Sequence, residues 1–194
     1  MDDQKEDPPV LEVVQEFKSF AEFEEALQRY QKHNYCLFLR RRSNLCKDNS
    51  ELKYTNARYE CKHFGSKRDN PNLTGERPMQ KSYKIGCKAF LYLSLKPKLQ
   101  RLVVDRFQPE HNHPCSKVTY EGYPEVRRMS RDTIKSVQEF TKLKAKPILI
   151  KPLVKAREGD KIILSRDISN VRTKQIRDER QGRSEEEMLL AALN

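Results

Sequence analysis

The sequence predicts an α+β fold, in which one helix and a β-rich module are followed by an all-helical segment. Three observations lead to this prediction. Apolar residues recur at helical spacing within residues 19–34, and four segments between residues 35 and 108 have the composition and alternation of strands. Beyond Tyr123-Pro124 the composition becomes typical of helices, so we place a boundary there.

The composition limits what this chain can be. Its 194 residues suffice for one or two small domains. Only 36% of the residues are hydrophobic and 35% are charged, so a small core would need help from a metal or from disulfides. Five cysteines are an odd number, and the acidic N-terminus lacks the apolar stretch of a secretory signal, which favours metal ligation. No run of about 18 apolar residues is present, so we expect no membrane span.

The charge is unevenly distributed along the chain. Residues 1–30 hold nine acids and three bases, whereas the whole chain carries a net charge of +11. A positive field of this kind attracts phosphate backbones or anionic membranes. No basic amphipathic helix of the membrane-surface type is evident, so nucleic acid is the favoured partner. The alternative is that these charges only keep the protein soluble.

The first predicted helix begins after Ser19 and ends near Asn34. Ser19 is a preferred N-cap residue, and Glu22 follows three residues later, which is the spacing of a capping box. An apolar stripe at helical spacing indicates a core-facing side rather than a ligand site. The stripe consists of Phe20, Phe23, Leu27 and Tyr30.

Four segments are predicted strands, at residues 35–39, 57–64, 85–95 and 99–108. The first leads into the basic run Arg40-Arg41-Arg42, and a short turn makes the last two a hairpin. Because strand side chains alternate, Cys61 and Cys87 are expected on inward faces of the second and third strands. If the extended conformation continues beyond the last strand, alternation places five side chains on the same face: Val103, Asp105, Phe107, His111 and His113.

Cys61, Cys87, His111 and His113 together offer two thiols and two imidazoles, the donor set of a tetrahedral structural zinc site. The two histidines are two residues apart, so an extended segment aims both rings the same way. The alternative is ordinary core thiols and surface histidines, since the wide cysteine spacing is weaker evidence than a CxxC pair. Cys115 is a rival ligand. Cys36 and Cys46 are expected to be a buried thiol and a loop thiol.

The C-terminal part is predicted to contain three helices. Ser130 caps the first, Pro147 breaks it, residues 148–158 form the second, and Ser165 caps a basic third helix. Three short helices of this kind resemble a helix-turn-helix unit, and a helical linker with a solvated basic face is the alternative. A second capping box at Ser184-Glu185-Glu186-Glu187 opens a further helix.

Several motifs together resemble a known family. They are the helix with Phe17, Ser19, Glu22 and Tyr30, the basic run at residues 40–43, Tyr59-Glu60-Cys61, Ile85-Gly86-Cys87-Lys88-Ala89, Leu102-Val103-Val104 and Glu110-His111-Asn112-His113. In this order they resemble the FAR-type (far-red impaired response) DNA-binding domain of the WRKY/GCM zinc-finger superfamily. They also resemble the N-terminal region of SWIM-type zinc finger proteins derived from Mutator-like transposases. The resemblance covers about residues 15–115.

This resemblance implies a small antiparallel sheet of four to five strands with Zn²⁺ at one end, held by Cys61, Cys87, His111 and His113. The catalytic carboxylate domain and the second Cys/His cluster of transposase relatives are not visible in this sequence. The predicted organisation has five parts: a disordered acidic start at 1–14, a FAR-like zinc-binding domain at 15–116, a linker at 117–129, helices at 130–180, and the start of a further helix at 181–194.

The sequence therefore predicts a nuclear, zinc-dependent module that binds double-stranded DNA, related to transcription regulators and without transposase chemistry. Candidate phosphate or base contacts are Arg40, Arg41, Arg42, Lys62, Lys67, Arg68, Lys81, Lys84 and Lys88. The alternative is a zinc-stabilised protein-interaction module that no longer reads DNA, with a protein partner on the C-terminal helices. No nucleophile elbow, phosphate loop or HExxH motif is present, so we expect neither an enzyme nor a small-molecule substrate.

Overall fold

The structure, a computed structural model, describes residues 9–47, 49–66 and 82–180. The chain divides into two compact units, Met1–Tyr120 and Glu121–Asn194, which we describe separately. Within the described residues, no helix combines the length and the hydropathy that crossing a membrane requires. The capping box predicted at residues 184–187 and the helix after it lie outside the described residues.

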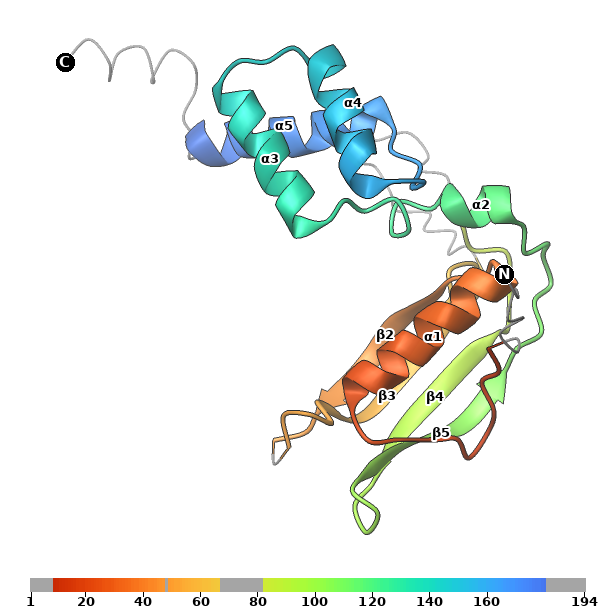
Figure 1. Ribbon diagram of the computed structural model, residues 1–194. Helices are drawn as coiled ribbons and strands as arrows, with labels where there is room; N and C mark the ends of the chain where they lie inside the picture. The colour runs from red at the N-terminus through yellow and green to blue at the C-terminus, as the bar shows by residue number, and fades with distance from the viewer. Residues whose placement is uncertain (1–8, 48, 67–81, 181–194) are drawn as a thin grey trace, which may run out of the picture. The chain divides into compact units, whose positions relative to one another are not determined.

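The first unit is a five-stranded antiparallel sheet with a long helix on one face (Figure 1). Its elements are β1 (Glu16–Phe17), α1 (Phe20–Asn34), β2 (Phe38–Leu45), β3 (Tyr54–Cys61), β4 (Phe90–Lys96), β5 (Arg101–Gln108) and α2 (Lys117–Glu121). The strand order is β1-β5-β4-β3-β2, so β2 is an edge strand. The predicted α+β class and the antiparallel sheet are confirmed.

The helix α1 begins and ends as its sequence indicates. The Ser19 hydroxyl accepts a hydrogen bond from the Glu22 backbone N–H at 3.2 Å, which satisfies a donor of the first turn. The Glu22 carboxylate accepts from the N–H of Lys18 at 2.7 Å, one residue before the position it reaches in a standard capping box. Tyr35 ends the helix in the left-handed region, with φ of 50°.

The core of this unit lies between α1 and the sheet. Phe23 on α1 is completely buried, and its ring centroid lies 5.4 Å from those of both Phe17 and Tyr59. The predicted stripe therefore faces the core. Residues 9–14, predicted as part of a disordered start, are also ordered: Leu11 is in the core, and Val14 donates its N–H to the Val104 carbonyl at 2.8 Å. Residues 1–8 lie outside the described part of the chain.

The predicted third strand, residues 85–95, begins later than expected. Gly86 has φ of +83°, a left-handed conformation that interrupts an extended strand. As a result Ile85 is 51% exposed, and Cys87 belongs to an isolated bridge with Phe64 rather than to a strand. The second predicted strand, residues 57–64, also differs, because β3 ends at Cys61 and turns.

The sequence predicts that Val103, Asp105 and Phe107 share one face of the last strand, and this prediction is wrong. Between the pairs Tyr92–Arg106 and Leu93–Val104 the register shifts by one residue, so Asp105 forms a bulge. The bulge moves alternate residues to the opposite face. Three residues of β5 therefore pack with the core: Leu102, Val104 and Phe107. Val103 and Asp105, expected in phase with Phe107, are not part of this core cluster, and Asp105 instead bonds Lys96 at 2.7 Å.

The second unit packs three helices around its own core: α3 (Arg131–Lys142), α4 (Pro147–Glu158) and α5 (Ser165–Arg180). Its buried apolar residues are Met129, Val137, Ile150, Val154 and Ile168. Ser130 caps α3 through the N–H of Thr133 at 3.2 Å. Ser165 is the first residue of α5 rather than its cap; the residue before it, Leu164, donates its N–H to Asp167 at 3.0 Å.

The residues predicted as a linker, 117–129, are structured. They contain the short helix α2, and buried residues follow it. The Arg127 guanidinium, only 4% exposed, donates to both carboxylate oxygens of Asp167 at 3.0 and 3.2 Å. This buried, two-bonded pair fixes the segment before α3 to the start of α5.

Replacing Phe23 with alanine should destabilise the first unit by about 3–5 kcal/mol, because a completely buried ring leaves a cavity between helix and sheet. Urea unfolding followed by circular dichroism measures this change. Leu99→Ala, in the exposed β4–β5 turn, is the control and should change the unfolding free energy by less than about 0.5 kcal/mol. Equal losses in the two variants would contradict a core centred on Phe23.

Candidate metal centre

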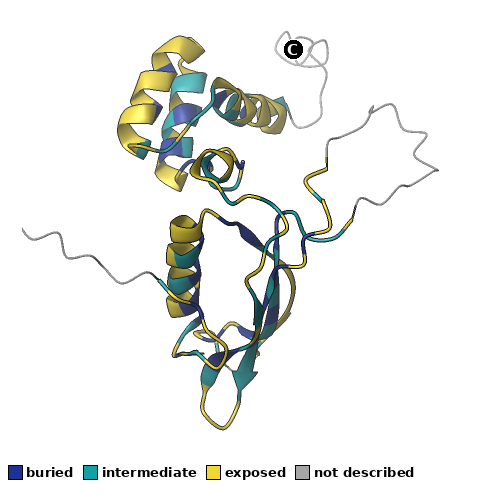
Figure 2. Ribbon diagram, turned by 90° about the vertical axis from the view of Figure 1, so that its right-hand side faces the viewer, coloured by how far each residue is buried: buried dark blue, intermediate teal, exposed yellow. Residues whose placement is uncertain are grey.

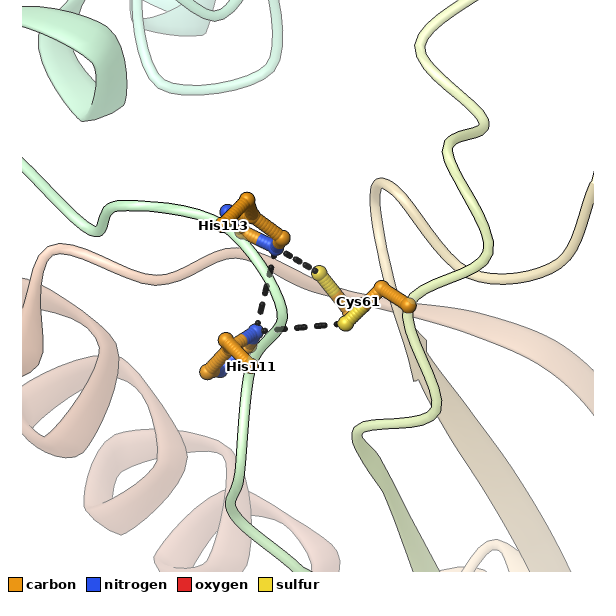
Figure 3. Close-up of side chains that lie close together, drawn as sticks. Cys61, His111 and His113 are labelled. Carbon is orange, nitrogen blue, oxygen red and sulfur yellow. Dashed lines mark hydrogen bonds between the residues drawn. The ribbon is translucent and has the colours of Figure 1, made fainter.

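Three separate segments bring four predicted ligands together at one end of the sheet. Cys61 is the last residue of β3, Cys87 lies just before β4, and His111 and His113 follow β5. The thiol sulfurs and one nitrogen of each ring all lie within 4.8 Å of one another. Figure 3 shows Cys61, His111 and His113 pointing toward a common point.

The closest approaches fit a tetrahedral ion. Cys61 Sγ lies 3.2 Å from His113 Nε2, and Cys87 Sγ lies 3.6 Å from His111 Nδ1. The two ring nitrogens are 3.2 Å apart. Ligands bound to zinc at about 2.3 Å for sulfur and about 2.0 Å for nitrogen would be separated by roughly 3.5 Å in a tetrahedron. The donor types and their spacing therefore both suit a metal ion of this kind.

Backbone contacts fix the two cysteine segments to each other. The Cys61 N–H donates to the Ala89 carbonyl at 3.0 Å, which extends the pairing of β3 with β4. Beyond the end of β3, the Gly65 N–H donates to the Cys87 carbonyl at 3.1 Å. These bonds hold the segment of Cys87 beside that of Cys61, although Cys87 lies outside the regular strand.

Asn112 fixes the histidine segment. Its side-chain amide donates to the Ile85 carbonyl at 3.2 Å, which joins the turn between the two histidines to the turn before Cys87. Gly86, between Ile85 and Cys87, provides the left-handed backbone of that turn. Sequence reasoning missed this role, because an asparagine between two histidines gives no signal about its distant partner.

Burial sets the electrostatics of the cluster. Cys61 and Cys87 are each 1% exposed, and both histidines are half-buried. Burial raises the pKa of the Cys61 thiol to about 12. Burial also lowers the pKa of His111 to about 4, and the neighbouring rings of His113 and His63 lower it further by a smaller amount. The protein alone thus favours a neutral Cys61 thiol and a neutral His111 imidazole, and a cation at the centre would favour the thiolate form of Cys61 instead.

The comparison with known proteins agrees with this centre. The family described as the N-terminal region of zinc finger SWIM domain-containing protein 3 matches residues 11–113. The chain belongs to this family. The matched segment contains Cys61, Cys87 and His111 and ends at His113, so it includes all four candidate ligands. No curated protein and no solved structure matches the chain.

The other cysteines of this SWIM-family chain lie outside the cluster. Cys115, the rival ligand, is half-buried and packs against the core, and among the described residues it is not one of the converging groups. Burial and the neighbouring Cys87 raise its pKa. Cys36 is buried in the core, as predicted, and Cys46 is partly exposed beyond β2.

His63 stands beside the cluster without being one of its four members. Its ring centroid lies 4.3 Å from that of His113, and its Nδ1 is 2.6 Å from the Tyr83 carbonyl oxygen. Its backbone N–H donates to Cys61 Sγ at 3.4 Å. This N–H would stabilise a thiolate at Cys61, which is a role that belongs to the backbone and leaves no signal in the sequence.

The three consecutive arginines lie in the middle of the edge strand β2, not at its end as predicted. Arg40 pairs with Tyr59, and its guanidinium lies 4.6 Å from the centroid of the Tyr54 ring. Arg42 pairs with Arg58, and the register shifts between Arg40 and Arg42, so the intervening Arg41 bulges from the ladder. All three arginines are exposed, and the bulge places Arg40 and Arg42 on opposite faces of the sheet.

The candidate lysines are spread over several environments. Lys62 is only 8% exposed, with its ammonium 4.6 Å from the centroid of the Tyr83 ring, so it is poorly placed to contact a phosphate. Lys84 is half-buried and Lys88 is exposed beside Cys87. The remaining candidates lie outside the described residues: Lys67, Arg68 and Lys81.

Proposed function

We propose that this chain is a zinc-dependent module that binds double-stranded DNA. The observation that carries the proposal is the convergence of two thiols and two imidazoles at tetrahedral spacing, inside the segment that matches a zinc finger protein family. The sequence resemblance to the FAR-type domain of the WRKY/GCM superfamily supports the same reading. A nuclear location and a role in transcription regulation belong to this proposal.

Zinc in this position would be structural. Four protein ligands fill a tetrahedral shell, whereas catalytic zinc sites keep one position open for water or substrate. The ion would join the end of β3, the segment before β4 and the segment after β5, beyond the regular strands. A closed site also supports our expectation that the chain is not an enzyme.

DNA binding is supported by the position of the arginines on β2. This strand lies at the edge of the five-stranded sheet, where it pairs with β3 on one side only, and strands can contact DNA through the major groove. Arg41 and Arg42 are exposed on β2. A net charge of +11 would add a sequence-independent attraction to phosphates.

A protein-interaction module is the second candidate, favoured by an apolar surface on α4. Ile148 is 76% exposed, Leu149 is 62% exposed and Leu153 is 46% exposed, which is unusual for three neighbouring large apolar residues. A protein partner on these helices would explain their exposure. This candidate predicts metal-dependent folding without retention of DNA.

The zinc proposal predicts one bound ion per chain. Native mass spectrometry of the purified chain should show one Zn²⁺, and Cys61→Ser should reduce the bound fraction at least tenfold, because it removes a thiolate ligand. Cys46→Ser is the matched control, since Cys46 lies outside the cluster, and it should retain the ion. A chain that contains no metal after purification with zinc present would contradict the proposal.

The DNA proposal predicts steep dependence on salt. Fluorescence anisotropy with a mixed-sequence duplex should give a linear fall of log affinity with log salt, and the double variant Arg41→Ala/Arg42→Ala should make that slope shallower by about 2.

Arg29→Ala/Lys32→Ala provides the matched control for this experiment. It removes the same charge from the exposed side of α1 and should leave the slope within about half a unit of the original. A duplex affinity that does not change with salt, or equal effects of the two double variants, would refute contact through β2.

A further inference from the structure

A row of four side chains crosses the face of the sheet that is opposite α1. Arg42 pairs with Arg58, Arg58 pairs with Tyr92, and Tyr92 pairs with Arg106. These residues therefore stand side by side on β2, β3, β4 and β5. With strands about 4.8 Å apart, the row extends for roughly 14 Å.

Alternation in β3 and β4 places this row away from the core. Tyr59 and Leu91, which flank the row along their strands, are buried under α1. By contrast, the Arg58 side chain is 34% exposed, Tyr92 is half-buried, and Arg42 and Arg106 are exposed. In Figure 2 the strands carry both buried positions, coloured dark blue, and less buried positions, coloured teal or yellow.

Guanidinium groups lie over aromatic rings along the row. The Arg106 guanidinium carbon is 5.5 Å from the centroid of the Tyr92 ring. The guanidinium carbon of Arg58 is 4.7 Å from the centroid of Phe90, which is two residues from Tyr92 on the same face, and 5.5 Å from that of Phe64. Such layers present planar, cationic surfaces to solvent.

The row itself carries three arginines and no acidic residue. Glu60 forms an ion pair with Arg58 at 2.8 Å and supplies a negative charge between Arg58 and the end of β3. Arg42 and Arg106 stand at the two ends of the row, one on each side of the Arg58–Tyr92 pair. The arrangement offers planar groups in the middle and cations at both ends.

We propose that this row is a binding platform for single-stranded nucleic acid. Unpaired bases stack on aromatic rings and on guanidinium planes, and arginines on an open sheet face contact the connecting phosphates. A duplex keeps its bases paired and stacked, so it cannot use such a platform. The platform shares Arg42 with the duplex contact proposed on the β2 edge, but Tyr92 and Arg106 lie outside that contact, on β4 and β5.

The test is anisotropy with labelled ten-nucleotide DNA and RNA strands of mixed sequence, with the full chain in its zinc-containing form. Tyr92→Ser should weaken binding between about fivefold and about 100-fold, the effect of losing one base-stacking contact. Tyr92→Phe keeps the ring and should retain the affinity. Comparing the affinities for the DNA and the RNA oligonucleotide shows whether the platform prefers deoxyribose or ribose.

Arg106→Lys keeps the charge, removes the planar group, and alters an exposed side chain, so it tests stacking without a risk to folding. It should weaken single-strand binding at least threefold and leave duplex binding unchanged. Arg29→Ala/Lys32→Ala is again the control for charge alone. Unchanged single-strand affinity in both Tyr92→Ser and Arg106→Lys would overturn the proposal, as would an equal loss for the duplex.

Discussion

Four candidate ligands from three separate segments converge where the sheet of the first unit ends. The remaining features of that unit depend on this convergence. The regular ladder of β3 and β4 ends at the pair Glu60–Phe90, and beyond it the segments of Cys61 and Cys87 are joined by irregular backbone hydrogen bonds. Burial raises the pKa of Cys61 and lowers that of His111, so the protein by itself leaves these groups neutral. A divalent cation would change the thiols to thiolates and join all three segments at once, which is why we propose zinc there.

The sheet between α1 and solvent gives the molecule several distinct surfaces. One face carries the core around Phe23, and the other carries the row of arginines and aromatic rings centred on Tyr92. The edge strand β2 lies at the border of both, and the bulge at Arg41 places Arg40 and Arg42 on opposite faces. Duplex DNA on the edge and single strands on the open face would thus share Arg42 but otherwise use different residues of one scaffold. The exposed apolar residues of α4 belong to the separate helical unit.

Much of this arrangement could be predicted from local patterns. Ser19 and the apolar stripe define α1, and donor chemistry selects the four ligands that the fold then brings together. Predictions failed where a single backbone feature changed which side chains face the core. The left-handed turn at Gly86 removes Cys87 from the strand, and the bulge at Asp105 reverses the faces of β5. Such features depend on pairing with distant segments, so periodicity alone does not reveal them. The bond from Asn112 to Ile85 is equally non-local.

Hydrogen exchange of the full chain before and after removal of metal by a chelator tests the metal centre most directly. We predict that backbone amides of residues 61–66 and 85–89 lose protection when the metal leaves, because the cation holds those segments beyond the end of the ladder. The amides of α3 and α5 should keep theirs, since they belong to the other unit and its own core. Identical protection of residues 61–66 and 85–89 with and without chelator would contradict a metal that holds this end of the sheet together.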